Sequence, residues 1–335
     1  MSKFSIILPV RNGGTYVHEC VGSILAQSYT EFQLLVLDNC STDGTREWLD
    51  SLRDGRIIVY PAERPLTIEE NWHRAVSIPK SEFITLIGHD DILDPHYLSV
   101  MDNLIASHPK ASLYQTHFRY IDSAGQIIRR SKPMDEVQNT RDFLAFFLSN
   151  SIDTMGTGFM MRSADYDAVG GIPPTYPNLL FADFELWINL TKISYRATAF
   201  EECFAFRLHQ SATTTSSTIK FHQAFVHFVQ YLSKLRQENP EMGKVIERYA
   251  IGFINFYTKG LAHRLLRAPK SKRGKLTVGG LINESQRLAD DLVPGNQLNP
   301  YAQPGVKLAR QIDSNFFTRQ LFLLFKKVYK RPVYS

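Results

Sequence analysis

The sequence predicts an α/β protein with a mostly parallel central sheet flanked by helices, followed by a helical C-terminal region. In the first hundred residues, apolar runs of strand length alternate with segments whose apolar residues recur every three or four positions. The strand runs carry few polar residues, as expected of strands that are buried on both faces. Strands of this kind that alternate with helices specify a parallel sheet covered by helices. From residue 220 onward only the helical periodicity continues.

Four strands and three helices are expected before residue 90. The strands are Lys3–Val10, Phe32–Asp38, Gly55–Pro61 and Glu82–Gly88. The helices are Thr15–Ser28, Ser41–Leu52, in which Ser41 and Asp43 are candidate N-caps, and Thr67–Ser77. Ligands of parallel sheets bind beyond the carboxyl ends of the strands, so the loops that follow these strands are the first place to search for a site.

The remainder of the first half mixes strands and helices. A hairpin is expected from Ser112–Asp122 and Gly125–Arg130, helices at Thr140–Asn150 and Leu179–Lys192, and strands at Gly156–Arg162 and within Tyr195–Thr215. Four C-terminal helices are expected at Phe221–Gln237, Glu241–Arg267, Lys275–Leu292 and Asn315–Arg331. The boundary is placed near residues 211–220, which gives one domain at 1–218 and a helical, basic region at 219–335.

Charge divides the chain in the same place. The net charge of +5 combines about −8 before Lys220 with about +13 from Lys220 to the end. The three cysteines are scattered without metal spacing, which favours reduced thiols. No apolar run approaches the roughly 20 residues of a membrane-spanning helix, and no signal peptide is recognised near the N-terminus. A cytoplasmic protein is therefore expected.

Polar residues cluster where three of the predicted strands end. Arg11–Asn12 follow the first strand, Asp38–Asn39 the second and Asp90–Asp91 the fourth. Any one pair is explained as well by a turn or a helix cap. Three pairs on the edge of the sheet where ligands bind favour a binding site.

The adjacent carboxylates Asp90 and Asp91 suit a hard divalent cation, Mg²⁺ or Mn²⁺, that also holds a phosphate group. The sequence contains no GxxxxGK[ST] phosphate loop, no GxGxxG dinucleotide fingerprint and no GxSxG nucleophile elbow. A metal that holds a diphosphate beside a carboxylate base suits sugar transfer from a nucleotide-sugar donor.

Ordered motifs over roughly residues 3–215 carry a family resemblance. The segments "FSIILPVRNGGTYVHECVGSILAQSYTEFQLLVLDNCSTDGT", "GHDDILDP", "GTGFMMRSADYDAVGG", "FADFEL" and "FRLHQSAT" resemble the family-two inverting glycosyltransferases. The resemblance implies a GT-A fold, which is Rossmann-like, and a nucleotide-sugar donor. Residues after 220 lie outside it.

The resemblance implies a nucleotide site at the first two strand ends. Pro9, Arg11 and Asn12 lie where the family lines the base, and Asp38 resembles the carboxylate that contacts a uracil- or thymine-type base. Asn39 stands where the family often has a second Asp, which suggests altered base specificity and leaves the base open. Asn71, with Trp72 beside it, lies where some relatives meet the donor.

The resemblance also implies a metal site. Asp91 would be the direct ligand of Mn²⁺ or Mg²⁺, and Asp90 would act on the ribose or support the metal. His209 resembles a histidine that reaches the metal or diphosphate, and Arg207 is a suggested phosphate contact. Gly88 and His89 stand where many relatives have further acidic residues, which lowers the expected metal affinity.

Asp183, in "FADFEL", matches the general base of the family, which takes a proton from the acceptor hydroxyl during inverting transfer. Glu185 has at most a supporting role. Without the resemblance, a helix cap is the favoured explanation of Asp183. The implied acceptor is a glycan or a lipid-linked glycan used for surface polysaccharide or glycolipid synthesis.

The basic C-terminal segments suggest a membrane partner. Residues 264–275 hold six basic residues and no acidic one, and Phe316–Arg331 combines aromatic and aliphatic residues with Lys and Arg. This composition is typical of an interfacial helix on an anionic membrane, here the inner face, and is equally compatible with a helix docked on the protein. No recognition motif accompanies the charge, so nucleic acid is not an expected partner.

Two other classes remain open at this point. The departures Gly88, His89 and Asn39 are compatible with a non-catalytic relative that binds a nucleotide sugar or glycan. A nucleotidyltransferase shares the use of a metal and a diphosphate, although no triphosphate-binding loop is found near the N-terminus.

Overall fold

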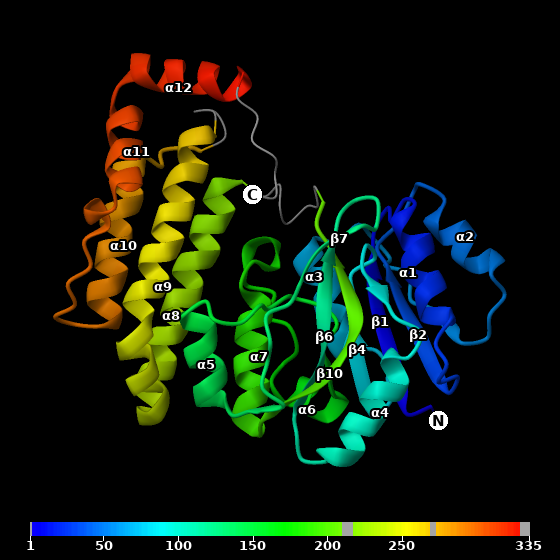
Figure 1. Cartoon of the computed structure of the whole chain (residues 1–335). Coiled ribbons are helices and arrows are strands. Elements are labelled where there is room, and N and C mark those ends of the chain that lie inside the picture. Colours follow the sequence, from blue (N-terminus) through cyan, green and yellow to red (C-terminus); the bar gives the residue numbers. More distant parts are fainter. Residues whose placement is uncertain (1, 210–216, 269–272, 329–335) are drawn as a thin grey trace. The chain divides into compact units, whose positions relative to one another are not determined.

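The computed structural model describes residues 2–209, 217–268 and 273–328. The chain falls into two units, residues 1–214 and 215–335. Figure 1 shows a sheet with helices in the first unit and helices alone in the second. Three expectations lie partly outside the described residues. They are the domain boundary near residues 211–220, the middle of the basic stretch 264–275, and the end of the expected helix Asn315–Arg331, beyond residue 328.

The first unit is built on a ten-stranded sheet whose main path runs β3-β2-β1-β4-β9-β6-β10-β5. Its parallel part consists of β1 (Phe4–Val10), β2 (Phe32–Asp38), β3 (Ile57–Val59) and β4 (Phe83–Leu86). Between them run α1 (Tyr16–Leu25), α2 (Thr45–Ser51) and α3 (Ile68–His73). Every residue of β1 is buried, as its apolar sequence requires. The predicted α/β order is confirmed.

The rest of the sheet is mixed. Strand β9 (Met160–Arg162) runs antiparallel between β4 and β6 (Leu113–Ile121), and β10 (Arg196–Arg207) runs parallel to β6. The predicted hairpin of β6 and β7 (Ile127–Arg130) is confirmed. The short strands β5 (Ile92–Leu93) and β8 (Val137–Gln138) pair with β10. The helices of this part are α4 (Tyr97–Ser107), α5 (Thr140–Leu148), α6 (Ser163–Ala168) and α7 (Ala182–Ile193).

Two local predictions are wrong, and each has a physical reason. Helix α2 begins at Thr45, after Gly44 in a left-handed conformation, and not at Ser41, because Ser41 accepts from Asn12 N in the loop after β1. Asp43 accepts from Gly14 N in that loop and also from Thr45 N at the start of the helix. The strand expected from Gly156 begins only at Met160. Gly158 has a φ of 76° and accepts a hydrogen bond from the Tyr97 hydroxyl, which interrupts extended backbone at that point.

The second unit contains α8 (Thr218–Glu238), α9 (Pro240–Arg267), α10 (Val278–Leu292), α11 (Pro304–Ser314) and α12 (Phe316–Val328). All but α11 were predicted. Helix α9 begins with Pro240, and Asn239 Oδ1 accepts from the backbone N–H groups of the first turn. Among the described residues, no helix is long and apolar enough to cross a membrane.

Gly158 gives a first test of how tightly the sheet packs near β9. A Cβ added at this residue would lie 2.7 Å from the Phe204 ring, and its positive φ disfavours a side chain. We expect Gly158→Ala to lower the free energy of unfolding by about 2–4 kcal/mol, measured by urea denaturation. Gly125→Ala is the control: its φ is 80°, but nothing lies within 4 Å of the added atom. Equal losses in both variants would show that the contact with Phe204 contributes nothing.

Candidate active site

The loops after β1 and β2 are held together by hydrogen bonds that cross between them. They include the bonds from Asn12 N to Ser41 Oγ (2.9 Å), Thr42 N to Asn12 Oδ1 (2.8 Å), Gly13 N to Thr45 Oγ1 (3.1 Å) and Gly14 N to Asp43 Oδ2 (2.9 Å). Asn12 has a φ of 54°, which asparagine tolerates. Pro9 is buried in β1 opposite Leu37, and Arg11 is exposed at the turn.

The polar residues that follow β2 are directed toward protein atoms. The carboxylate of Asp38, 4% exposed, accepts from Ser41 N at 3.4 Å. The amide of Asn39 donates to Leu66 O at 3.0 Å and accepts from Leu66 N at 2.7 Å. Both polar atoms of the Asn39 side chain are thus bonded to Leu66, and Asn39 anchors the chain before α3. These contacts do not favour the expected role of Asn39 in recognising the nucleotide base.

Asn71 is buried in a similar way. Its amide donates to Leu37 O at 3.1 Å and accepts from Arg74 Nη1 at 2.9 Å. Arg74 Nη1 also reaches the carbonyl of Asp38 at 3.4 Å, and its Nη2 bonds to Tyr60 O. Asn71 therefore holds the ends of β2 and β3 together, and these contacts favour a structural role over the expected contact with the donor.

Asp91 lies at the centre of the site and is 1% exposed. Its Oδ2 accepts from Thr157 Oγ1 at 2.6 Å, and its Oδ1 accepts from the backbone N–H of Arg207 at 3.0 Å. Burial raises the pKa of Asp91 well above its ordinary value, the charge of Asp90 raises it further, and the two hydrogen bonds oppose both effects. Both carboxylate oxygens of Asp91 are thus bound within the protein.

Asp90 and His209 form the more open pair. Asp90 Oδ2 and His209 Nε2 lie 2.5 Å apart, with side chains 19% and 17% exposed. Burial would raise the pKa of Asp90, but the His209 hydrogen bond and the charges of His89 and His209 hold it below its ordinary value. A carboxylate beside an imidazole is a donor set that suits Mg²⁺ or Mn²⁺ when phosphate oxygens complete the shell. Within the described ranges, no group of three His, Cys, Asp or Glu residues could hold a metal by itself.

Arg207 fixes the end of β10 and is 3% exposed. Its Nε donates to Asp90 O at 2.8 Å, and its Nη2 donates to Glu19 Oε2 at 2.5 Å. The guanidinium lies 4.5 Å from the centre of the Tyr16 ring, whose edge contacts His209. These contacts favour a structural role over the suggested phosphate contact. Tyr16 and Glu19 were missed from the sequence, because they read as ordinary residues near the start of α1.

Asp183 lies in the first turn of α7 and is partly exposed. Burial raises the pKa of its carboxyl group to about 7, although backbone N–H groups of Phe184 and of Asp183 itself bond to it and oppose the shift. The residues just before it, Asn178, Leu179 and Phe181, all have φ between 55° and 70°. Residues with a side chain rarely adopt such backbone conformations, so backbone strain is stored next to this carboxylate.

The loop Gly156–Gly158 joins the two acidic groups. A Cβ built on Gly156 would lie 3.4 Å from Asp183 Oδ2, and the neighbouring Thr157 donates to Asp91. The structure thus brings Asp90, Asp91 and His209 together and places Asp183 across this loop. Glu185 accepts from the Tyr176 hydroxyl at 2.5 Å, in keeping with a supporting role. Thr157 was missed, because only the glycines of this motif drew attention in the sequence.

The fold of the chain, with polar loops beyond the carboxyl ends of β1, β2 and β4, is similar to the folds of known structures. The structure of S. aureus TarS 1–349 in complex with UDP-GlcNAc matches with a TM-score of 0.66 and 15% identity, over 98% of this chain and 93% of that one. The mannosyltransferase PcManGT from Pyrobaculum calidifontis, in complex with GDP-Man and Mn²⁺, matches with a TM-score of 0.52 and 14% identity, over 97% and 88% of the two chains. These likenesses confirm the GT-A fold.

Residues 5–170 match the family described as glycosyl transferase family 2, and the chain belongs to this family. The putative teichuronic acid biosynthesis glycosyltransferase TuaG of Bacillus subtilis (strain 168) is 25% identical over 60% of this chain and 77% of its own length. Other curated relatives are matched over a smaller share of their own length, 41% in one and 13% in another. The family predicted from the sequence is confirmed.

The hydrogen bond between Thr157 and Asp91 can be tested by its effect on stability. Thr157→Val keeps the shape of the side chain but removes the donor to a buried carboxylate. We expect it to lower the free energy of unfolding by about 1–3 kcal/mol, measured by urea denaturation. Thr157→Ser keeps the hydroxyl and should cost less. A valine variant as stable as the serine variant would contradict this account of Asp91.

Asn39 offers a second test. Asn39→Ala leaves the half-buried N–H and C=O groups of Leu66 without their partner, so we expect a loss of about 1–2 kcal/mol in the free energy of unfolding. The preference among nucleotides, followed by the thermal shifts that they cause, should not change. A variant of full stability with an altered nucleotide preference would restore the specificity role expected from the sequence.

Proposed function

We propose that this protein transfers a sugar from a nucleotide-diphosphate sugar, a UDP- or dTDP-sugar, to a glycan or lipid-linked acceptor with inversion. The observation that carries the proposal is the carboxyl group of Asp183. Burial raises its pKa to about 7, and the loop Gly156–Gly158 that adjoins it also bonds, through Thr157, to Asp91 beside the Asp90–His209 pair. The complexes of TarS with UDP-GlcNAc and of PcManGT with GDP-Man support a donor of this class.

Asp183 acts as the general base in the proposed reaction. The acceptor hydroxyl oxygen forms a bond to the anomeric carbon while the bond from that carbon to the diphosphate breaks. The hydroxyl proton passes to Asp183, and the nucleoside diphosphate leaves with the bonding electron pair. A base whose pKa is near the working pH is efficient, because it is largely ionised and still takes up a proton readily.

Asp90 and His209 are the residues proposed to hold a divalent metal, Mn²⁺ or Mg²⁺. When bound, the metal would neutralise charge on the leaving diphosphate. Asp90 is favoured over Asp91 as the direct ligand, because both oxygens of Asp91 are bound by Thr157 and Arg207. Asp91 would then position the Asp90 segment. The Mn²⁺ in the PcManGT complex supports use of such a metal.

The wider setting is also a proposal. The name of TuaG supports an acceptor in surface polysaccharide synthesis. Residues 1–218 would carry the catalytic site. Residues 219–335 would bring it to the inner face of a membrane, where a lipid-linked acceptor is found, and the protein would be cytoplasmic and peripheral. The basic charge of this C-terminal part supports attraction to anionic lipid.

The proposed base predicts the dependence of activity on pH. The value of kcat/KM for nucleoside diphosphate release should rise about tenfold per pH unit below about 7 and level off above it, because only ionised Asp183 accepts the proton. Asp183→Asn should lower this value of kcat/KM by a factor of about 10²–10⁴. A flat profile, or an active Asn variant, would contradict the assignment.

Stability provides the control for this variant. The pKa of Asp183 is raised on folding, so its ionisation destabilises the folded state as pH rises from about 4 through about 7. Asp183→Asn should therefore unfold at a higher temperature than the wild type at pH 8, while the two should unfold alike at pH 4. A variant less stable at pH 8 would show that burial does not disfavour the ionised form.

The metal assignment predicts different losses at the neighbouring aspartates. In the presence of UDP, Asp90→Asn should weaken Mn²⁺ binding at least about tenfold, as measured by electron paramagnetic resonance. Its melting temperature should change little. Asp91→Asn should mainly lower the melting temperature, because its amide presents a donor to the donors of Thr157 and Arg207. Loss of Mn²⁺ binding in a fully stable Asp91→Asn variant would instead make Asp91 the direct ligand.

A further inference from the structure

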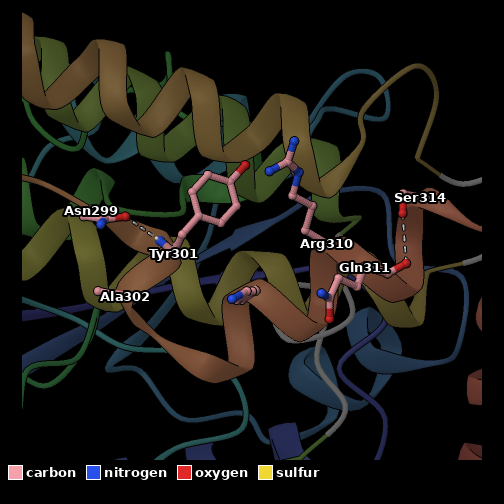
Figure 2. A pocket seen from close by; sticks show the side chains of 7 residues that line it. Asn299, Tyr301, Ala302, Arg310, Gln311 and Ser314 are labelled. Carbon is pink, nitrogen blue, oxygen red and sulfur yellow. Dashed lines mark hydrogen bonds between the residues drawn. The ribbon is translucent and has the colours of Figure 1, made fainter.

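A pocket in the second unit lies between α11 and the short 3₁₀ helix Pro300–Ala302. Its volume is about 450 Å³, within the range of about 300–1,000 Å³ typical of small-molecule sites. Figure 2 shows Tyr301 and Arg310 side by side over it, with the guanidinium carbon 4.8 Å from the ring centre. The lining residues are Asn299, Tyr301, Ala302, Lys307, Arg310, Gln311 and Ser314.

The pocket is built to attract an anion. Lys307 and Arg310 are its charged lining residues, and no acidic residue lines it. Asp313, the only acidic residue between positions 300 and 328, is buried in an ion pair with Arg273 at 2.5 Å and lies 3.5 Å from Arg319. The positive charge at the pocket is therefore not balanced by the acidic residue of α11.

Helix α12 presents an apolar stripe to solvent. Its exposed apolar side chains, between 56% and 88% accessible, are Phe316, Phe317, Leu321, Leu324, Phe325 and Val328. At 100° per residue these lie on one side of the helix, opposite Arg319. Arg319 is 2% exposed and donates to Ala268 O, which attaches the other side of α12 to the end of α9. The helix is thus held by its polar side and exposes its apolar side.

The pocket and the stripe are neighbours along the chain. Ser314, on the pocket wall, is two residues from Phe316, so their Cα atoms are at most about 7 Å apart. Asn315 between them caps α12 by accepting from the backbone N–H groups of Phe317 and Thr318. An anion site and an apolar stripe therefore adjoin at the junction of α11 and α12.

We propose that this junction binds an anionic phospholipid of a bilayer, an inference that rests on the membrane association proposed above and names its site. Lys307 and Arg310 hold the headgroup phosphate, with Arg310 lying over the Tyr301 ring. The stripe of α12 lies at the boundary between headgroups and acyl chains. Free phosphate would not require the stripe. Nucleic acid would not require it either, whereas lipid uses both features.

The test is flotation of the full-length protein with vesicles of phosphatidylcholine alone or mixed with phosphatidylglycerol. The wild type should float only with the mixed vesicles. Lys307→Gln/Arg310→Gln should bind them about thirtyfold more weakly, from two charges at about 1 kcal/mol each. Leu321→Gln/Leu324→Gln should also lose binding. Circular dichroism verifies that each variant is folded.

Lys234→Gln/Lys244→Gln is the matched control, since it removes two exposed charges from α8 and α9. Lys244 lies about 36 Å along α9 from Ala268, well beyond the screening length of about 10 Å. Binding close to that of the wild type supports the pocket. An equal loss in this control, binding of single-stranded RNA without vesicles, or full flotation of Leu321→Gln/Leu324→Gln would overturn the proposal.

Two further readouts separate this inference from its alternatives. A stable dimer in the absence of vesicles that Leu321→Gln/Leu324→Gln disperses would overturn it, because the stripe would then cover a second copy of the chain. Nucleoside diphosphate release without vesicles should be the same in the pocket variant and the wild type, which supports a role outside the transfer site. If flotation behaves as expected while no donor is turned over, the lipid site stands and the proposed transfer reaction fails.

Discussion

The site depends on one buried carboxylate. Asp91 joins two partners that are distant in sequence, Thr157 at a separation of 66 residues and Arg207 at 116, through hydrogen bonds of 2.6 and 3.0 Å. Such a carboxylate is costly to bury unless donors meet both of its oxygens. The donors come from the loop before β9 and from the end of β10, so the carboxylate fixes where these two segments meet the end of β4.

The position of each neighbouring group follows from that bond. On one side of Asp91, Asp90 meets His209 within reach of solvent, and Arg207 holds the Asp90 backbone. On the other side, the loop that carries Thr157 brings Gly156 against Asp183. The two carboxyl groups that remain partly open are driven in opposite directions: the pKa of Asp90 is lowered and that of Asp183 is raised to about 7. Such a division suits one group that binds a cation and another that accepts a proton.

Strand positions and the three polar strand ends could be predicted, because buried strands leave apolar runs in the sequence and parallel strands end together. The roles of adjacent polar residues could not be separated in this way. Asn39 is occupied by Leu66, 27 residues away, and Asp91 is distinguished from Asp90 only by Thr157 and Arg207. Helix α11 was missed because it is short and holds few apolar residues, although these share one face; Val306 and Ala309 are its buried residues.

The account is tested most directly by nucleoside diphosphate release from UDP-, dTDP- and GDP-sugars, each with Mn²⁺, Mg²⁺ or EDTA, in the wild type and in Asp183→Asn. It predicts that one donor of the UDP or dTDP class is turned over only with a divalent metal, and that the Asn variant loses this turnover while still binding the nucleotide. Turnover that persists in the variant would contradict the role of Asp183. Pyrophosphate release from a nucleoside triphosphate, or no metal-dependent nucleotide binding at all, would contradict the proposed reaction itself.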